Sequence, residues 1–366
     1  MALFQGANPV GLDIGTASIK LVETVLPARA RVRVRRLSSL PTPSGALAEG
    51  VVMQPGRIAA ALRLLWQRAA PRTRRVAVSV SGPGVLVRRL PFPKMRLPEL
   101  RKILALQLDR YVPFAKDGAF YDIYPLGPGL NPGEMEVLFA AAPARQIATL
   151  TEACRQAGLQ PVRVEVDALP LIRALVGCGL IRIDSSVAVL DIGAGGSRIS
   201  LTEHGIPVLT RFLGPVPGTT PVPAPVAGGS DADDLGPLPD SAPTSTAVQD
   251  PLAAGLEGLE SFAQLLANQD LSLDPALEDY FWDVRKGIEF TMAATKTFLP
   301  EALFLTGGGA TPLLAQRLES YLREWLGERL GNDFAVRIAE TPMLNLLPDF
   351  NLAFGLAIPP EHYDDE

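Results

Sequence analysis

The chain has 366 residues, of which 47% are hydrophobic, and a formal net charge of −5 at pH 7. This length allows two domains with separate cores, and the longest apolar stretches fall far short of the roughly 20 residues that a membrane-spanning helix needs. The 2 cysteines and 2 histidines are too few for a disulfide framework, a zinc site or imidazole-based catalysis. No basic-then-apolar signal precedes Gly11, so we expect a cytoplasmic protein with reduced thiols.

The acidic charge is concentrated in one part of the chain. Between Arg211 and Arg285 there are 12 Asp and Glu and no Lys, Arg or His. The remainder is net basic by about seven charges, which is too small an excess to favour nucleic-acid binding as a main function. We therefore expect no nucleic-acid partner.

The first 84 residues predict a βββαβ unit. Apolar runs at 11–14 and 19–25 predict two strands joined by a short glycine-containing turn. In "ARVRVRRLSSL" valines alternate with Arg31, Arg33 and Arg35, which predicts a third strand with an arginine face. We interpret that face as solvated rather than anion-binding. A helix at 55–69 and the strand "RRVAVSVSG" complete the unit.

An α+β insert is expected at 85–158. Prolines introduce a helix at about 98–112, two strands follow in "AFYDIYPL" and "EMEVLFAAAP", and a second helix is expected at 144–158. The chain then returns to a strand, "PVRVEVD", and a helix, "ALPLIRALVG". The first domain core is therefore assigned to 1–84 and 159–182.

The opening pattern occurs a second time. Asp13-Ile14-Gly15 matches Asp191-Ile192-Gly193, and each motif ends an apolar strand. Lys20 lies seven residues beyond Asp13, and Arg198 lies seven beyond Asp191. This repeat predicts two similar halves that face each other.

The second half is interrupted by a segment of different composition. Residues 214–255 contain 15 Pro and Gly among 42 residues and no positive charge, which predicts a mobile insert. Residues 256–299 predict a small helical subdomain. The second domain core is assigned to 183–213 and 300–366, where "EALFLTGGGATPLLAQRLESYL" predicts a strand, a glycine turn and a helix.

Three glycine turns that each follow a strand predict a nucleotide site, because small residues expose backbone N–H groups to phosphate oxygens. Thr16, Ser18 and Ser197 add hydroxyls, and Lys20 adds a positive charge. The candidate nucleotide-binding residues are Gly15, Thr16, Ala17, Ser18, Lys20, Gly193, Ala194, Gly195, Gly196, Ser197, Gly307, Gly308, Gly309 and Ala310. Asp13 and Asp191 are the candidate ligands for hydrated Mg²⁺, which commonly uses one or two carboxylates together with phosphates.

With these motifs the chain resembles the actin/hexokinase/DnaK ATPase superfamily, whose phosphate-1, phosphate-2 and adenosine motifs correspond to the three turns. "ALPLIRAL" and "DFNLAFGLAI" resemble its two interdomain connecting helices. More narrowly, "RRLPFPKMRLPELRKILALQLDRYVPF" and "EMEVLFAAAPARQIATLTEACRQAGLQPVRVEVDALPLIRAL" resemble the PilM family of type IV pilus assembly proteins.

The resemblance implies an α/β, bilobed actin-like ATPase fold, made of two ribonuclease-H-like domains with an inserted subdomain like that of FtsA. It also implies ATP and Mg²⁺ in the interdomain cleft and a location at the inner face of the cytoplasmic membrane. The implied partner is the N-terminal tail of the inner-membrane protein PilN, docked between the first core and the insert. Other pilus inner-membrane proteins are further candidate partners, and self-association, filament formation and the pilus output (adhesion, twitching or DNA uptake) stay open.

Departures from the superfamily bear on catalysis. After Phe212 the expected glycine-rich turn and nucleotide-gripping Glu/Lys helix are not recognisable. Asp167 occupies the position at which hydrolysing relatives carry a water-orienting polar residue in the first connector, so it could act as a base or a metal ligand. We favour the alternative interpretation, in which it is the N-cap of the helix that begins at Ala168. Any ATP hydrolysis would be slow.

Two rival functions belong to the same superfamily. An FtsA-like division protein would carry a basic amphipathic C-terminal anchor, whereas this chain ends in the acidic "PPEHYDDE". A small-molecule kinase would need a carboxylate base and a closed substrate pocket, and no sugar-kinase signature is present.

Overall fold

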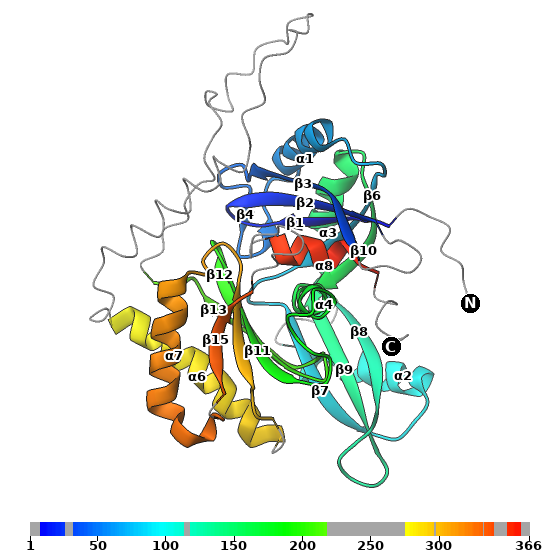
Figure 1. The fold of residues 1–366 in the computed structure, drawn as a ribbon. Coiled ribbons are helices and arrows are strands. Elements are labelled where there is room, and N and C mark those ends of the chain that lie inside the picture. The colour runs from blue at the N-terminus through cyan, green and yellow to red at the C-terminus, as the bar shows by residue number, and fades with distance from the viewer. Residues whose placement is uncertain are drawn as a thin grey trace, which may run out of the picture.

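The computed structural model describes residues 8–25, 32–112, 118–217, 275–295, 298–331, 333–339 and 350–359. It forms two lobes, each built on a sheet (Figure 1). The first sheet has the strand order β10-β6-β1-β2-β3. Its strands are β1 (Val10–Ile14), β2 (Ser18–Val25), β3 (Arg33–Pro41), β6 (Arg75–Val80) and β10 (Gln160–Val166). A small hairpin, β4 (Leu47–Ala48) and β5 (Val51–Val52), lies between β3 and the first helix.

The second sheet repeats the order of the first. Its strands are β11 (Ser186–Gly193), β12 (Gly196–Glu203), β13 (Ile206–Gly214), β14 (Ala302–Thr306) and β15 (Ala335–Ile338). They run β15-β14-β11-β12-β13, with β11–β12–β13 antiparallel and β14 and β15 parallel to β11. Asp13 is paired with Lys20 in the first hairpin, as Asp191 is paired with Arg198 in the second. The predicted repeat is therefore a repeat of topology and register.

Helices α1 (Pro55–Ala69) and α3 (Ala144–Gln156) cover one face of the first sheet. Apolar residues at helical spacing on α1, such as Ile58, Leu62 and Leu65, are fully buried. On α3, Leu150 and Cys154 enter the same core. The sequence reading placed α3 inside the insert, but its apolar side packs on α1 and the first sheet.

The inserted subdomain consists of β7 (Leu86–Pro93), α2 (Leu97–Gln107), the short helix η1 (Leu108–Arg110), β8 (Ala119–Pro128) and β9 (Glu134–Pro143). Its own core surrounds Phe139, with Leu100 and Leu104 from α2. The strands continue the second sheet as β13-β7-β9-β8. The junction is the pair Leu209–Arg88, reinforced by the Val87 N–H, which donates to Thr210 Oγ1 at 3.1 Å. The insert is thus covalently part of the first lobe and hydrogen-bonded to the second.

The second lobe has its own core, formed by its sheet with α6 (Pro275–Thr295) and α7 (Pro312–Leu326). The short helix η4 (Gly327–Arg329) follows α7. Most of the predicted mobile insert at 214–255, and the first predicted helix of the 256–299 subdomain, lie outside the described residues. The second predicted helix of that subdomain is α6, which packs on the second sheet.

Two helices lie between the sheets. Leu171 and Leu175 of α4 (Ala168–Gly177) pack with Val189 and Phe304 of the second sheet. Helix α8 (Asn351–Ala357) packs on the first sheet and on α4. A Cβ at Gly355 would lie 1.7 Å from the Pro170 carbonyl oxygen, so only glycine permits the observed contact between α8 and α4. These are the segments that resemble interdomain connectors.

Candidate functional site

The first candidate turn, between β1 and β2, is held by neighbouring backbone. The Gly15 N–H donates to the Ser18 carbonyl at 3.1 Å. The Thr42 hydroxyl donates to the Gly15 carbonyl at 2.6 Å, and the Thr42 N–H donates to the Ala17 carbonyl at 3.0 Å. Thr16 at the tip is exposed. Lys20 lies behind the turn, with its Nζ 3.3 Å from Asp13 Oδ2.

The second turn is a tight hairpin closed by the pair Gly193–Gly196. Gly196 has φ +141°, and a Cβ there would meet the Phe212 ring. The Ser197 hydroxyl, which we expected at the ligand, is buried; it donates to the Gly214 carbonyl at 2.6 Å and accepts from Tyr280 at 2.8 Å. Its side chain therefore fixes β12 to β13 and α6.

The first two turns contact each other across the lobes. A Cβ built on Gly195 would lie 2.2 Å from Thr16 Oγ1. While the Thr16 side chain keeps this orientation, only glycine fits at position 195. The two predicted phosphate turns are thus brought together.

The third turn packs on the second. Gly307 has φ +85°, and its Cβ position lies 2.5 Å from the Ile192 carbonyl oxygen and 2.8 Å from Asp191 Oδ1. The Gly309 N–H donates to the Ile192 carbonyl at 3.0 Å. Close packing therefore accounts for Gly307 and Gly309, whereas Gly308 is exposed. Ala310 follows, and its N–H donates to the Gly307 carbonyl at 3.1 Å.

Three carboxylates meet beside these turns. Loss of solvent, together with the nearby charges of Asp167 and Asp13, raises the pKa of Asp191 to about 7, against the opposing effect of Lys20 and Arg198. Burial also raises the pKa of Asp167, partly offset by Arg198. The cluster is thus short of positive charge, which is the condition that a bound cation would relieve.

Arg198 is the functional residue that sequence reasoning did not select. Its strand belongs to the second lobe, but its guanidinium is buried against the first lobe. Nε lies 3.0 Å from Asp167 Oδ2, and Nη2 donates to the Gly82 carbonyl at 3.1 Å. The available signal was its spacing of seven residues from Asp191, which matches that of Lys20 from Asp13. Spacing alone does not tell that one cation pairs within its hairpin and the other across the cleft.

Asp167 is the N-cap residue of α4, as expected, but its side chain does not act as a cap, since it makes no capping hydrogen bond. Its Oδ2 pairs with Arg198, and its buried Oδ1 has no hydrogen-bond partner in the described part of the chain. Desolvation makes the ion pair the more stable arrangement, because a buried carboxylate needs a cation more than the helix needs this cap.

The donor set fits Mg²⁺ together with phosphate rather than a metal held by protein alone. Within the described ranges, no group of three or more His, Cys, Asp and Glu side chains could hold a metal ion. Mg²⁺ typically needs only one or two carboxylates when phosphates and waters complete its shell. Asp13 and Asp191, with the unpartnered Asp167 Oδ1 nearby, meet that requirement.

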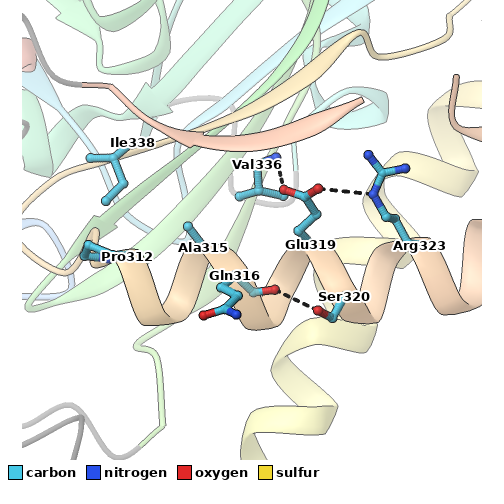
Figure 2. A pocket seen from close by; sticks show the side chains of 8 residues that line it. All are labelled: Pro312, Ala315, Gln316, Glu319, Ser320, Arg323, Val336 and Ile338. Atoms are coloured by element: carbon cyan, nitrogen blue, oxygen red, sulfur yellow. Dashed lines mark hydrogen bonds and ion pairs between the residues drawn. The ribbon is translucent and has the colours of Figure 1, made fainter. Parts of the chain in front are cut away.

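A separate groove of about 500 Å³ lies between α7 and β15 (Figure 2). Glu319 Oε2 accepts from the Val336 N–H at 2.9 Å, and its Oε1 accepts from Arg323 Nε at 3.1 Å. The charged side chains that line this groove satisfy one another. It therefore presents no reactive group.

Comparison with known proteins places these features in context. A family model described as type IV pilus assembly protein PilM matches residues 11–213. A solved PilM–PilN type IV pilus biogenesis complex contains a chain 27% identical to this one, with a TM-score of 0.68; the match covers 96% of this chain and 97% of that chain. No curated protein matches the chain.

Two further solved structures are less similar. A Bacteroides thetaiotaomicron protein with an actin-like ATPase fold is 11% identical, with a TM-score of 0.45 and coverage of 98% and 100%. The ethanolamine utilization protein EutJ from Carboxydothermus hydrogenoformans is 15% identical, with a TM-score of 0.42 and coverage of 97% and 91%. The duplicated strand order and the match to the PilM chain confirm the expected bilobed actin-like fold. No helix in the described ranges is long and apolar enough to cross a membrane.

The Arg198–Asp167 pair can be tested by its effect on stability. We expect Arg198→Met to lower the free energy of unfolding by about 3 kcal/mol, because it leaves a buried carboxyl without its cation. Arg198→Met combined with Asp167→Asn should recover part of that loss. Urea unfolding at neutral pH measures both variants.

A matched control is Arg182→Met, which removes a surface partner of Asp184. It should leave stability essentially unchanged. An Arg198→Met variant as stable as this control would contradict the assigned role.

Asp191 predicts a specific pH dependence. Its pKa is raised from 3.8 to about 7 in the folded chain, so the folded state binds the extra proton and the free energy of unfolding falls as pH rises across that window. Asp191→Asn should therefore be more stable than the parent at pH 8, by about 1–2 kcal/mol after allowance for partial solvent contact. The difference should close near pH 4.

Thermal unfolding in EDTA between these pH values measures this difference. Asp184→Asn is the control, because an arginine partner lowers the pKa of Asp184 instead. A stability gap for Asp191→Asn that does not change with pH would show that the carboxyl titrates normally.

Proposed function

The chain belongs to the PilM family of type IV pilus assembly proteins, and we propose that it is an ATP-binding, actin-like assembly protein of the cytoplasmic face of the inner membrane. In this role it docks the N-terminal tail of a PilN-like inner-membrane protein. Nucleotide occupancy sets the relation of the two lobes and so the affinity for that partner. Other pilus inner-membrane proteins and self-association are further interactions in this proposal.

The observation that carries the nucleotide proposal is the meeting of three glycine turns around a carboxylate cluster that is short of positive charge. Asp13 and Asp191 would position the waters of Mg²⁺, and Lys20 would contact phosphate. Backbone N–H groups at Thr16, Ala17 and Ser18, and at Gly193, Ala194, Gly195 and Gly196, would donate to phosphate oxygens, whereas the Gly15 N–H is already used by the Ser18 carbonyl. Ser197 would shape the second turn, since its hydroxyl bonds Gly214 and Tyr280.

The adenosine would lie at Gly307, Gly308, Gly309 and Ala310. Gly308 is the exposed residue of this turn, so a ligand could approach its backbone closely because no side chain stands in the way. Bound Mg²⁺ would supply charge neutralisation of the phosphates. The chain's own residues would bind and orient the nucleotide.

Binding rather than rapid turnover is the proposed role of the cleft. Asp167 is the one candidate for orienting water, but it is held by Arg198 and buried. A buried carboxylate with one oxygen held by a guanidinium is poorly placed to contact and orient an attacking water. We therefore propose that ATP hydrolysis, where it occurs, is slow.

The PilN proposal is supported by the similar chain in the solved PilM–PilN complex, which matches this one over 96% of its length. The insert, with its separate core beside the first lobe, is the proposed docking element. A peptide that orders on binding loses conformational entropy, so a preformed groove between two rigid cores suits it.

The roles of Asp13 and Lys20 are separable by calorimetry. Asp13→Ala should weaken Mg-ATP binding about tenfold or more, and metal-free ATP binding less, because the carboxylate acts through the cation. Lys20→Ala should weaken ATP binding even in EDTA, since its charge contacts phosphate directly. Equal losses for Asp13→Ala with and without Mg²⁺ would exclude the metal role.

The docking role of the insert can be tested by truncating its hairpin. Replacing residues 90–137 with Asn-Gly closes the β7–β9 ladder after the Arg89–Leu138 pair. The junction to the second lobe is kept, including Arg89 Nη1 at 2.9 Å from Glu203 Oε2. We expect binding of a synthetic PilN N-terminal peptide to be lost, by fluorescence anisotropy, while ATP binding persists.

The retained ATP binding is the control for folding. A truncated chain that binds ATP and still binds the peptide with the affinity of the intact chain would place the groove elsewhere.

A further inference from the structure

One end of the first lobe lies opposite the nucleotide turns. Strands β1, β6 and β10 are parallel, and the turns lie at their carboxyl ends. At the other end, the loop before β6 meets the end of β2, because the Arg72 N–H donates to Glu23 Oε1 at 2.8 Å. The carboxyl end of α3 lies beside α1 there, since Arg63 Nη1 donates to the Gln156 carbonyl at 2.8 Å. In Figure 1 this end comprises the finish of α1 and the start of β6.

This end is strongly basic. We define the basic pole as the arginines on β3, α1 and the α1–β6 loop that gather there: Arg33, Arg35, Arg36, Arg63, Arg68, Arg72 and Arg74. Of the acidic residues that the structure describes, Glu23 and Glu152 lie beside them. Glu23 is buried, and Glu152 lies one turn back on α3, where it accepts from Gln156.

Ordinary structural roles account for part of this charge. Arg35 and Arg36 both pair with Glu23, so that one carboxylate offsets one of the two cations. Arg68 and Arg155 lie in the last turns of α1 and α3, where they oppose the partial negative charge of the helix ends.

A surplus remains. In the part of the chain that the structure describes, no carboxylate pairs with Arg33, Arg63, Arg68, Arg72 or Arg74, while 14 ion pairs exist elsewhere or at Glu23. Arg33, Arg68, Arg72 and Arg74 are exposed. Packing does not require four exposed cations without counter-charge at one end of a domain.

The apolar residues beside these arginines indicate the partner. Val25, paired with Arg33, is 39% exposed, and Leu64, one helical turn from Arg68, is 42% exposed. Single-stranded nucleic-acid surfaces typically interleave basic residues with exposed aromatic rings for base stacking. Here the exposed large apolar side chains are aliphatic, and the aromatic ring nearby, Trp66, is partly buried with its indole N–H bonded to the Thr73 carbonyl. Aliphatic groups between cations suit the boundary between lipid headgroups and acyl chains.

We propose that the basic pole binds the surface of an anionic phospholipid bilayer directly. Guanidinium groups of Arg33, Arg68, Arg72 and Arg74 donate hydrogen bonds to headgroup phosphates. Val25 and Leu64 enter the headgroup layer beside them. The nucleotide turns then face away from the bilayer. This contact needs neither nucleotide nor a protein partner, so it stands independently of the function proposed above.

Vesicle co-sedimentation of the full chain, without nucleotide or PilN peptide, tests the proposal. Vesicles of phosphatidylcholine with about 30% phosphatidylglycerol should carry the chain down, and pure phosphatidylcholine vesicles should not. Raising NaCl from about 0.1 M to about 0.5 M should release it, because salt screens surface charge. The triple variant Arg33→Gln, Arg68→Gln, Arg72→Gln should lose about tenfold or more in apparent affinity.

A charge-matched control keeps the test specific. Arg110→Gln, Arg182→Gln, Arg329→Gln removes three exposed cations that lie outside the basic pole. It should bind anionic vesicles as the parent does, and unfolding curves should be the same for both triple variants.

Several results would overturn the proposal. They are equal binding to neutral vesicles, equal loss in the control variant, or no loss in the basic-pole variant. Binding of a DNA duplex through the same three arginines, without vesicle binding, would reassign the surface to nucleic acid.

Discussion

One buried guanidinium links the two lobes beside the glycine turns. Arg198 is carried by β12 of the second lobe, yet it forms an ion pair with Asp167 and donates to the carbonyls of Gly82 and Val85 in the first. If the lobes moved apart, Asp167 and Arg198 would each be left as an unpaired, poorly hydrated charge unless water entered between them. An ion pair flanked by hydrogen bonds to the Gly82 and Val85 carbonyls allows discrete arrangements more readily than gradual ones, because partial separation loses these contacts before hydration replaces them. The geometry of the three turns, and therefore any ligand between them, follows from whether this pair is made.

The duplicated halves have diverged at one equivalent position. Lys20 and Arg198 occupy the same place in their hairpins, each opposite an aspartate. Lys20 pairs with that aspartate, whereas Arg198 passes its own Asp191 and reaches the other lobe. Arginine is the cation suited to this, since its planar group can serve several acceptors at once. Among the described residues, Asp191 is left without a paired cation, and burial raises its pKa to about 7. One half thus supplies a local pair and the other a link between lobes.

Much of the fold could be predicted because its signals are local. Apolar strands that end in Asp-Ile-Gly, and helix α1 with its proline start, are readable from neighbouring residues. The parts that were missed depend on contacts distant in sequence. Helix α3 joins the first core because α1, nearly 90 residues earlier, offers its apolar side. The Ser197 hydroxyl bonds Gly214 and Tyr280, which lie 17 and 83 residues away in the chain. The Asp167 side chain pairs with Arg198 of the other lobe instead of capping α4. No sequence pattern around residue 167 predicts that pair.

The tight seating of α8 has a consequence for biosynthesis. Ala353 and Ala357 pack so closely on β1 that a Cβ at Gly11 would lie 1.8 Å from the Ala353 carbonyl oxygen. The first strand of the chain and the last helix of the structure are therefore mutual packing partners. While the ribosome is still translating, β1 must wait with one face uncovered until the residues of α8 have been made. Domains usually complete themselves in order from the amino terminus, but here the first lobe cannot be completed before α8, which follows most of the second lobe. A truncated or stalled product would keep apolar surface beside the nucleotide strand exposed, a state that quality-control chaperones recognise.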